Sequence, residues 1–388
     1  KLMFQRWLTL PPDTSCLLLG PRRSGKTTFL RHRYPELRYT TLDDLDYLDW
    51  AKKDPKGFIQ DLAASGIIDE IQRCPQLTVA VKHAIDSSDA FFLMTGSSSL
   101  GLLDAAADTL AGRMAIQALP PACWGENQGP PTHAILTEKA SPLQLRQGNR
   151  LLRQAMTYGL FPEILTCEAE TQKKELLNRY KNTFFTRDLM QLSNIENLNG
   201  LLAIFHHLLH SLGSHLEVSN FAREAGVSHP TVKKYLNALA QAQLTFSLRG
   251  YQFGPAKRFL KAAKTYFVDN GIPQSFHIRI GEGPLLENFV ISEMEKRRKL
   301  GYIPAERMYY YKSSSGQEID LLFETEDTLY AIEVKSTSNP GNKDIRNLKH
   351  FDTQKDMRVQ RILFYPGEEY SERDNVYLVP IAALFRGK

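Results

Sequence analysis

The sequence has few cysteines and no long apolar run. Its four cysteines, Cys16, Cys74, Cys123 and Cys167, include no C-x-x-C pair, so neither a disulfide framework nor a zinc knuckle is indicated. No window approaches the roughly 18 uninterrupted apolar residues that a membrane span needs, and the opening residues KLMFQRWLTLPPD lack the apolar core of a secretory signal. We therefore expect a cytoplasmic protein with free thiols and no membrane partner.

We find no internal repeat and no low-complexity tract, and the composition excludes a disordered or fibrous chain. The length of 388 residues favours two or three domains. The net charge is only +5, but residues 200–300 hold 13 Lys and Arg against 7 Asp and Glu. This local excess of positive charge is typical of a surface that meets phosphate, and it is also compatible with a merely solvated surface.

The hydrophobic pattern divides the chain into three regions. In the first, strand-like runs alternate with helical patterns, which predicts a parallel sheet with crossover helices. A segment rich in Pro and Gly at 120–131 ends this pattern, helical periodicity dominates 143–248, and strand-like runs return after a helix that includes Glu287. We expect an α/β protein with domains at 1–135, 136–280 and 281–388. The strand-like runs are 15–19, 66–68, 90–94, 308–311, 319–323, 329–334 and 361–365.

Residues 20–27, GPRRSGKT, fit the pattern G-x-x-x-x-G-K-[ST] between an apolar strand and a helix, which is the context that a phosphate-binding loop needs. Backbone N–H groups would face the β-phosphate of ATP, Lys26 would reach the β- and γ-phosphates, and Thr27 would hold Mg²⁺. The alternative is a chance glycine-rich turn, against which the flanking strand and helix argue. The predicted nucleotide-binding residues are Gly20, Pro21, Arg22, Arg23, Ser24, Gly25, Lys26, Thr27 and Thr28.

Two adjacent carboxylates, Asp69 and Glu70, follow a second strand. Asp69 would support Mg²⁺ and Glu70 would polarise the attacking water, so the pair predicts hydrolysis rather than nucleotide binding alone. Ser97 stands at a polar strand end that would sense the γ-phosphate, although a plain serine-rich turn explains it as well. Arg113 would neutralise charge in the transition state, whereas a lone arginine is more often a surface residue.

Residues 219–239 carry the capping and turn residues typical of a helix-turn-helix, within a winged-helix region at about 212–250. Ser219 would cap a first helix, Gly226 supplies the turn, and Ser228 opens a second helix. A lid or a protein interface is the alternative. The DNA-contacting residues predicted on the second helix are Thr231, Lys233, Lys234 and Asn237, and the neighbouring Lys257, Arg258, Lys261 and Lys264 favour the same function.

Four histidines, at 206, 207, 210 and 215, suggest a metal site because His206 and His210 lie four residues apart. No third ligand is evident and the H-E-x-x-H pattern is missing, so a polar helix flank is the favoured interpretation.

Carboxylates recur in the last region at Glu287, Asp320 and Glu333, and Lys335 follows two residues after the last of them. Asp320 and Glu333 would share Mg²⁺ with Glu287 nearby, while Lys335 would activate a water for phosphodiester cleavage. The pattern resembles the PD-(D/E)xK nuclease superfamily. The alternative is a retained fold that only holds nucleic acid or a partner.

The order of GPRRSGKTT, IIDEIQ, LMTGSSS and LAGR resembles bacterial and archaeal AAA+-type P-loop ATPases whose C-terminal region carries a winged helix and a nuclease-like fold. Segments at 158–163, 186–189, 267–271 and 283–288 extend the resemblance over nearly the whole chain. It implies ATP and Mg²⁺ as cofactors, catalytic roles for Asp69 and Glu70, a sensor role for Ser97, and an arginine finger at Arg113 that acts in cis or in trans. It also makes a dimer or a ring plausible, while the sequence allows a monomer.

These observations predict an ATPase whose nucleotide state controls a DNA-binding half that also cuts DNA. One alternative is an ATP-gated DNA-binding module with an inactive nuclease-like domain. A second is a regulatory switch that recognises proteins or small signals, for which weak and salt-insensitive DNA affinity is expected.

Overall fold

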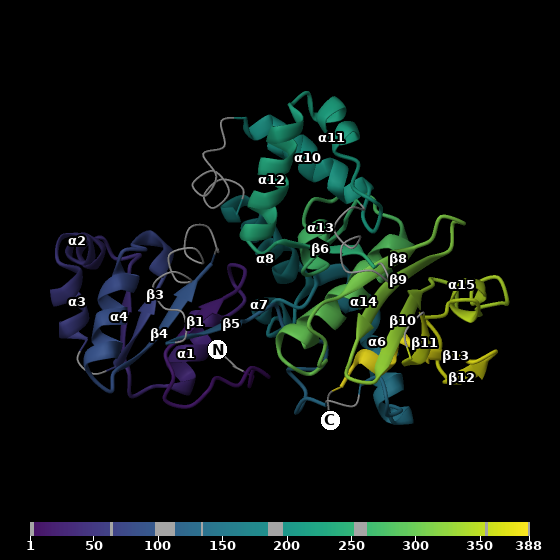
Figure 1. Cartoon of the computed structure of the whole chain (residues 1–388), viewed down its shortest axis with the longest axis horizontal. Helices are drawn as coiled ribbons and strands as arrows, with labels where there is room; N and C mark the ends of the chain where they lie inside the picture. The colour runs from purple at the N-terminus through teal and green to yellow at the C-terminus, as the bar shows by residue number, and fades with distance from the viewer. Residues whose placement is uncertain are drawn as a thin grey trace.

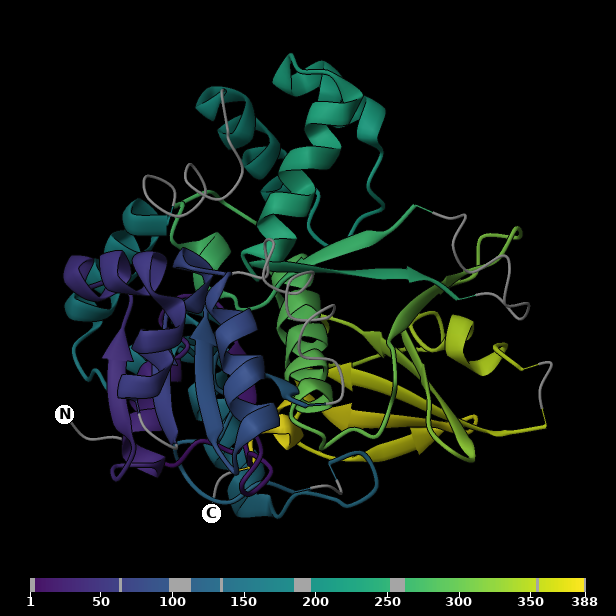
Figure 2. The same cartoon turned by 60° about the vertical axis from the view of Figure 1, so that its left-hand side comes forward.

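The computed structural model describes residues 4–62, 65–97, 113–132, 135–184, 197–251, 262–353 and 356–386. An N-terminal sheet with its helices, a group of helices and a second sheet follow one another along the chain (Figure 1). In Figure 2 the long helix α14 (Glu282–Lys299) stands between the two sheets. Within the described residues, no helix is both long enough and apolar enough to cross a membrane.

The N-terminal sheet is wholly parallel, as the alternating pattern predicted, and its strand order is β2-β3-β4-β1-β5. Because all five strands run the same way, their carboxyl ends share one edge. The strands are β1 (Cys16–Leu19), β2 (Arg38–Thr41), β3 (Ser65–Asp69), β4 (Phe91–Gly96) and β5 (Ala115–Ala118). The helices are α1 (Lys26–Arg33), α2 (Leu45–Lys53), α3 (Pro55–Asp61), α4 (Leu77–Ser87) and the short 3₁₀ helix η1 (Ile71–Arg73).

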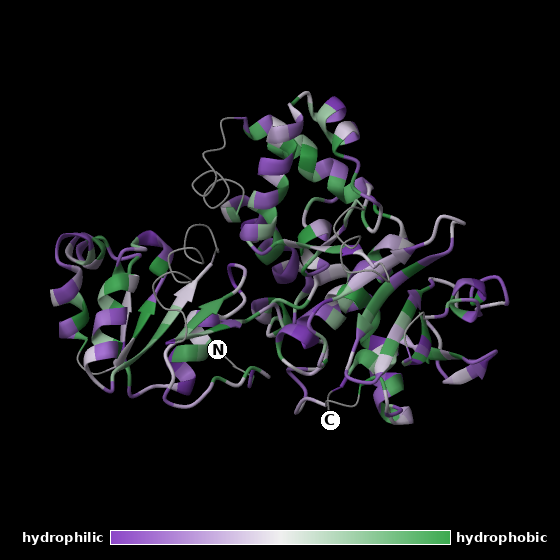
Figure 3. Cartoon of the chain, in the orientation of Figure 1, coloured by the Kyte–Doolittle hydropathy of each residue, from purple (hydrophilic) through white to green (hydrophobic). Residues whose placement is uncertain are grey.

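Strand β1 lies between β4 and β5 and is buried on both faces, which explains its continuous apolar run. Leu17 and Leu19 point into one hydrophobic cluster, and Cys16 and Leu18 point into another on the opposite face. Figure 3 shows the same arrangement as hydrophobic strands between helices that carry hydrophobic and hydrophilic stripes. A rigid strand therefore leads directly into Gly20.

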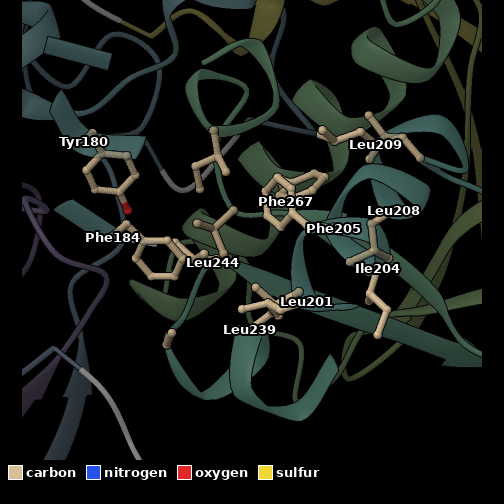
Figure 4. Packing of buried hydrophobic residues seen from close by; sticks show 14 of the residues in the cluster. Tyr180, Phe184, Leu201, Ile204, Phe205, Leu208, Leu209, Leu239, Leu244 and Phe267 are labelled. Atoms are coloured by element: carbon tan, nitrogen blue, oxygen red, sulfur yellow. The ribbon is translucent and has the colours of Figure 1, made fainter. Parts of the chain in front are cut away.

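The middle region is mostly helical, as its periodicity predicted. Tyr180 and Phe184 from the end of α8 and Phe205 from α10 form part of one core with Phe267 from a following strand (Figure 4). Ser228 caps α12 by accepting a hydrogen bond from the Thr231 amide. The helices are α6 (Pro142–Tyr158), α7 (Pro162–Leu165), α8 (Glu170–Thr183), α10 (Leu198–His210), α11 (Val218–Ala225) and α12 (His229–Gln241).

Two strands that follow α12 join the C-terminal sheet. Strand β6 pairs antiparallel with β7 and parallel with β8, so the eight strands run in the order β12-β13-β11-β10-β9-β8-β6-β7. The strands are β6 (Thr245–Gly250), β7 (Lys264–Phe267), β8 (Tyr309–Lys312), β9 (Glu318–Glu324), β10 (Thr328–Val334), β11 (Arg358–Tyr365), β12 (Ser371–Arg373) and β13 (Val376–Pro380). The short helices nearby are α13 (Gly271–Gln274), α15 (Arg346–Lys349) and the 3₁₀ helix η4 (Ile381–Leu384).

Helix α14 is the structural link between the regions. Arg297, which is wholly buried, pairs with Glu293 at 2.8 Å and also donates to the Trp124 carbonyl oxygen. Lys296 donates to the Ala122 carbonyl oxygen and to Asp269. Lys296 and Arg297, which contribute to the positive charge at 200–300, are therefore in buried ion pairs rather than on the surface.

Candidate functional site

The loop from Gly20 to Thr27 joins β1 to α1 at the carboxyl edge of the N-terminal sheet, where the motif placed it. A Cβ atom at Gly20 would lie 2.2 Å from the Leu119 carbonyl oxygen, so only glycine fits. Gly25 has a φ of 90°, in the left-handed region that glycine adopts without strain. Pro21 and Ser24 are buried, Arg22 and Arg23 are half-buried, and Thr28 is exposed.

Lys26 is buried, and its ammonium group donates to the carbonyl oxygens of Gly20 at 2.9 Å and Pro21 at 3.1 Å. A buried ammonium group needs oxygen partners, and the loop itself supplies them. Because these carbonyl oxygens are uncharged acceptors, a charged phosphate oxygen would displace them from the Lys26 ammonium group.

Asp69, buried at the end of β3, accepts hydrogen bonds from three hydroxyl groups on three different elements. Thr27 donates at 2.9 Å from the first turn of α1, and Tyr39 donates at 2.7 Å from β2. Thr95 on β4 donates to the same carboxylate. Three donors fix the orientation of the Asp69 carboxylate beside the phosphate-binding loop.

Glu70 follows with a φ of 59°, so its side chain turns away from the direction of β3. Its carboxylate accepts hydrogen bonds from Gln72 and from Ser97, the latter at 3.4 Å. Burial raises the pKa of Glu70, and the ammonium group of Lys26 opposes that rise. The predicted sensor Ser97 thus contacts the predicted base.

Arg6 supports the loop from outside the motif. Its guanidinium group donates to the Ser24 carbonyl oxygen at 2.5 Å, to the Pro120 carbonyl oxygen at 2.8 Å and to Glu126 at 2.8 Å. Because these partners lie far away along the sequence, no local pattern could have indicated Arg6. Tyr39 was also missed as a site residue, and Thr95 was indicated only as part of the polar strand end that holds Ser97.

Helix α7 approaches the loop from the middle region. Arg23 pairs with Glu163 at 3.3 Å, and a Cβ atom built on Gly25 would lie 3.7 Å from the Pro162 ring. The segment Tyr158–Glu163 is one of those on which the resemblance rests, and the structure brings it to the phosphate-binding loop.

Arg113 lies at the amino ends of the strands, whereas the phosphate-binding loop lies at their carboxyl ends. Strand β5 is parallel to β1, and Ala115 is in register with Cys16. Four residues at about 3.3 Å each separate that end of β1 from Gly20, so Arg113 is about 13 Å or more from the loop. It pairs with Asp86. This position corrects the alternative in which Arg113 acts on the nucleotide of its own chain.

The C-terminal carboxylates have a lysine beside them that was not predicted to contact them. The ammonium group of Lys264 lies 2.5 Å from Glu318 and 3.9 Å from both Glu287 and Asp320. Lys335 pairs with Glu333 at 3.2 Å. Across the described residues, no three His, Cys, Asp or Glu side chains stand where they could hold a metal ion. The metal set of Glu287, Asp320 and Glu333 stays a prediction, and Lys264 stands beside two of its three acids.

Burial dominates the ionisation of these acids. It raises the pKa of Glu287 to about 8, to which Asp320 adds and which Lys264 opposes. Burial also raises the pKa of Asp320, and it raises that of Glu333 to about 7 against the effect of Lys335. Although burial acts the other way, Lys264 holds the pKa of Glu318 below its usual value.

On α12 the side chains of Lys233, Lys234 and Asn237 are exposed and Thr231 is half-buried. Val232 and Leu239 are buried on the opposite face. Gly226 ends α11 with a φ of 62°, as predicted for the turn. Helix α11 begins at Val218, so Ser219 lies in its first turn and is not its cap.

The histidines of α10 line a depression in the surface. His206, His207 and His210 line it together with Glu224, which pairs with His207. Several other predicted positions lie outside the described residues. They are Ser98, Ser99, Leu110, Thr186, Arg187, Asp188, Leu189, Lys257, Arg258 and Lys261.

Residues 13–127 match the family model described as an AAA domain. The first third of the chain is thus an AAA-type ATPase-like domain. Residues 149–278 match a domain of unknown function (DUF8612), and residues 282–384 match another (DUF4143). The chain therefore combines an AAA-type domain with a C-terminal DUF4143 domain.

The relatives align over nearly the whole chain. An uncharacterized protein of Mycobacterium tuberculosis is 26% identical over 381 residues, covering 94% of this chain and 79% of the relative. An uncharacterized protein of Methanocaldococcus jannaschii is 24% identical, covering 98% of this chain and 89% of the relative.

Two solved structures are also similar. A signal transduction ATPase with numerous domains and a tetratricopeptide repeat sensor, from Pyrococcus horikoshii, aligns at 9% identity with a TM-score of 0.24, and 76% of this chain spans only 46% of that protein. A protein from Vibrio cholerae aligns at 13% identity with a TM-score of 0.22 over 96% of this chain and 95% of its own.

Proposed function

We propose that the AAA-type domain binds ATP and hydrolyses it with Mg²⁺. The contact between Thr27 and Asp69, whose side-chain oxygens lie 2.9 Å apart, supports this most directly. A hydroxyl at the start of the helix and a carboxylate at the end of a neighbouring strand are the donor set that holds Mg²⁺ in P-loop ATPases. The oxygen chemistry of these two residues fits the ion.

The other residues of the loop would act on the phosphates. The backbone N–H groups of Gly20–Thr27 would cradle the β-phosphate at the positive end of α1. Lys26 would exchange the carbonyl oxygens of Gly20 and Pro21 for β- and γ-phosphate oxygens, and Mg²⁺ would neutralise charge on the phosphates when bound.

Glu70 would orient the attacking water and receive its proton. Its carboxylate is held by Gln72 and Ser97, so water is aligned by a positioned group rather than by a mobile one. Asp69, which is held by Thr27, Tyr39 and Thr95, would be the metal ligand.

Lys26→Ala tests this assignment. We expect ATP affinity to fall at least about tenfold, because the variant cannot form charge-assisted hydrogen bonds to the phosphates. The measurement is calorimetric titration with ATP and Mg²⁺, followed by phosphate release. Lys56→Ala, which changes an exposed lysine of α3, is the control and should match the wild type. Unchanged ATP affinity and turnover in Lys26→Ala would refute the site.

We further propose that the exposed face of α12 binds DNA. Lys233 and Lys234 would contact phosphates, while Thr231 and Asn237 would reach base edges. The capped helix holds these side chains on a fixed scaffold because Val232 and Leu239 anchor its other face. ATP hydrolysis would change how the middle region contacts the loop, through the pair Arg23–Glu163.

Fluorescence anisotropy with a labelled duplex at several salt concentrations tests the α12 surface. The variant Lys233→Ala should weaken binding and lower the slope of log K against log salt by about 1, because one fewer phosphate is neutralised. Lys174→Ala, at an exposed position of α8, serves as the matched control. Weak wild-type binding with little dependence on salt would instead favour a switch that does not use nucleic acid.

We divide the chain functionally at 1–135, 136–280 and 281–388, with β6 and β7 of the middle part completing the sheet of the last part. We assign no cleavage to the last part. A DNA-binding module that does not cut is favoured over a nuclease, because Lys264 lies among the acids that a nuclease would use for metal. If Arg113 contributes to hydrolysis, it does so from a neighbouring copy in a dimer or ring.

A further inference from the structure

The carboxylate cluster of the C-terminal sheet contains a lysine that comes from another part of the chain. Lys264 is the first residue of β7, and its side chain is only 3% exposed. Its ammonium group lies 2.5 Å from Glu318 and 3.9 Å from both Glu287 and Asp320. Glu287 comes from α14, whereas Glu318 and Asp320 come from β9.

A second residue of β7 contacts the same cluster. Tyr266, two residues after Lys264 and therefore on the same face of the strand, donates a hydrogen bond to Glu287 at 2.7 Å. The hairpin of β6 and β7 follows directly after α12. The cluster is thus where the helical region is fastened to the C-terminal sheet.

The acids already have cationic or hydrogen-bonding partners. Asp320 accepts a hydrogen bond from the Val334 amide at 3.0 Å, and Glu333 pairs with Lys335 at 3.2 Å. Mg²⁺ would need near-octahedral oxygen ligands at about 2.0–2.1 Å. An ammonium group within 4 Å of Asp320 and Glu287 competes for those oxygens and repels a second cation.

We infer that the ammonium group of Lys264 is the resident cation of this cluster, in place of a divalent metal, and that it anchors the β6–β7 hairpin to the C-terminal domain. A buried lysine beside carboxylates has its own charge balanced by them. The acids still precede the E-x-K sequence at the end of β10, but their function is structural. Through Lys264 they set the position of α12 relative to the second sheet.

Manganese binding tests this inference independently of any activity. The full chain without nucleotide is titrated with Mn²⁺, and free ion is followed by electron paramagnetic resonance. We expect the wild type and Asp320→Asn to bind the same number of ions, because the wild-type cluster holds none. Mn²⁺ bound by the wild type and released in both Asp320→Asn and Glu333→Gln would overturn the inference.

Removing the ammonium group of Lys264 should create a site for a divalent cation in the cluster. We expect Lys264→Ala to gain one Mn²⁺ per chain, and the double variant with Asp320→Asn to lose it again. The thermal midpoint of Lys264→Ala should fall without Mn²⁺ and recover when Mn²⁺ is added. A Lys264→Ala chain that keeps the wild-type circular dichroism and midpoint yet gains no ion would contradict the inference. Lys312→Ala, which removes the exposed partner of Glu318, is the control.

Discussion

The guanidinium group of Arg6 donates to the carbonyl oxygen of Ser24, 18 residues away and inside the phosphate-binding loop. Through its other nitrogens it holds Glu126 and the Pro120 carbonyl oxygen. The loop is therefore braced by the N-terminal arm and by the segment that follows β5.

Arg6→Ala should destabilise the protein, because Glu126 would stay buried with an unpaired charge. We expect the free energy of unfolding to fall by about 3–5 kcal/mol, as measured by urea denaturation. Lys53→Ala removes the exposed pair with Asp49 and should cost no more than about 1 kcal/mol. Equal losses in the two variants would show that Arg6 is not a brace.

Tyr39→Phe should lower ATP turnover while leaving ATP affinity near the wild-type value. The change removes one donor to Asp69, and a hydrogen bond to a charged acceptor contributes about 1.5–3 kcal/mol, so a tenfold loss or more in kcat is expected. Steady-state phosphate release gives kcat and KM separately. Tyr377→Phe, on the exposed side of β13, is the control; wild-type kcat in Tyr39→Phe would exclude a positioning role.

Asp269→Asn should weaken the junction of the middle region with α14. The Asp269 carboxylate is buried, accepts from the Leu160 amide at 2.9 Å and pairs with Lys296 at 3.3 Å. Loss of its charge should cost about 3 kcal/mol in thermal or urea unfolding. The exposed pair Lys349–Asp374 provides the comparison, and Asp374→Asn should be nearly neutral. The reverse order of effects would contradict this description of the junction.

The four thiols should differ in reactivity. Cys16, Cys74 and Cys123 are buried, and burial raises the pKa of Cys16 to about 12, whereas Cys167 is half-buried. Because the thiolate is the reactive form, iodoacetamide at neutral pH should label only Cys167 in the native protein and all four after unfolding. Peptide mass spectrometry reads this directly. Fast native labelling of Cys16 would mean that β1 is not a buried interior strand of the sheet.

The sequence predicted the features that have a local signal. Residues 20–27 carry their own pattern, and the apolar runs of β1, β3 and β4 determined the parallel sheet. Strand β2 was missed because RYTT is short and largely polar, with only Thr40 buried. Its importance comes from Tyr39, which contacts Asp69 across 30 residues of sequence.

Contacts between distant segments escaped prediction for a physical reason. Arg6 and Glu126 are 120 residues apart, and neither lies in a pattern that identifies the other. The excess of Lys and Arg at 200–300 indicated a basic segment. However, the side chains of Lys264, Lys296 and Arg297 are buried in ion pairs. Charge counts do not distinguish a lysine on the surface from one that neutralises a buried acid.

The most direct test of the ATPase is Glu70→Gln, with Glu36→Gln at an exposed position as the control. The measurement is phosphate release at saturating ATP and Mg²⁺, beside the amount of ATP that each chain retains on a desalting column. We expect Glu70→Gln to retain ATP but to hydrolyse it at least about a hundredfold more slowly, because the base that prepares the water is gone. Hydrolysis by Glu70→Gln at the wild-type rate would contradict the assignment of this site.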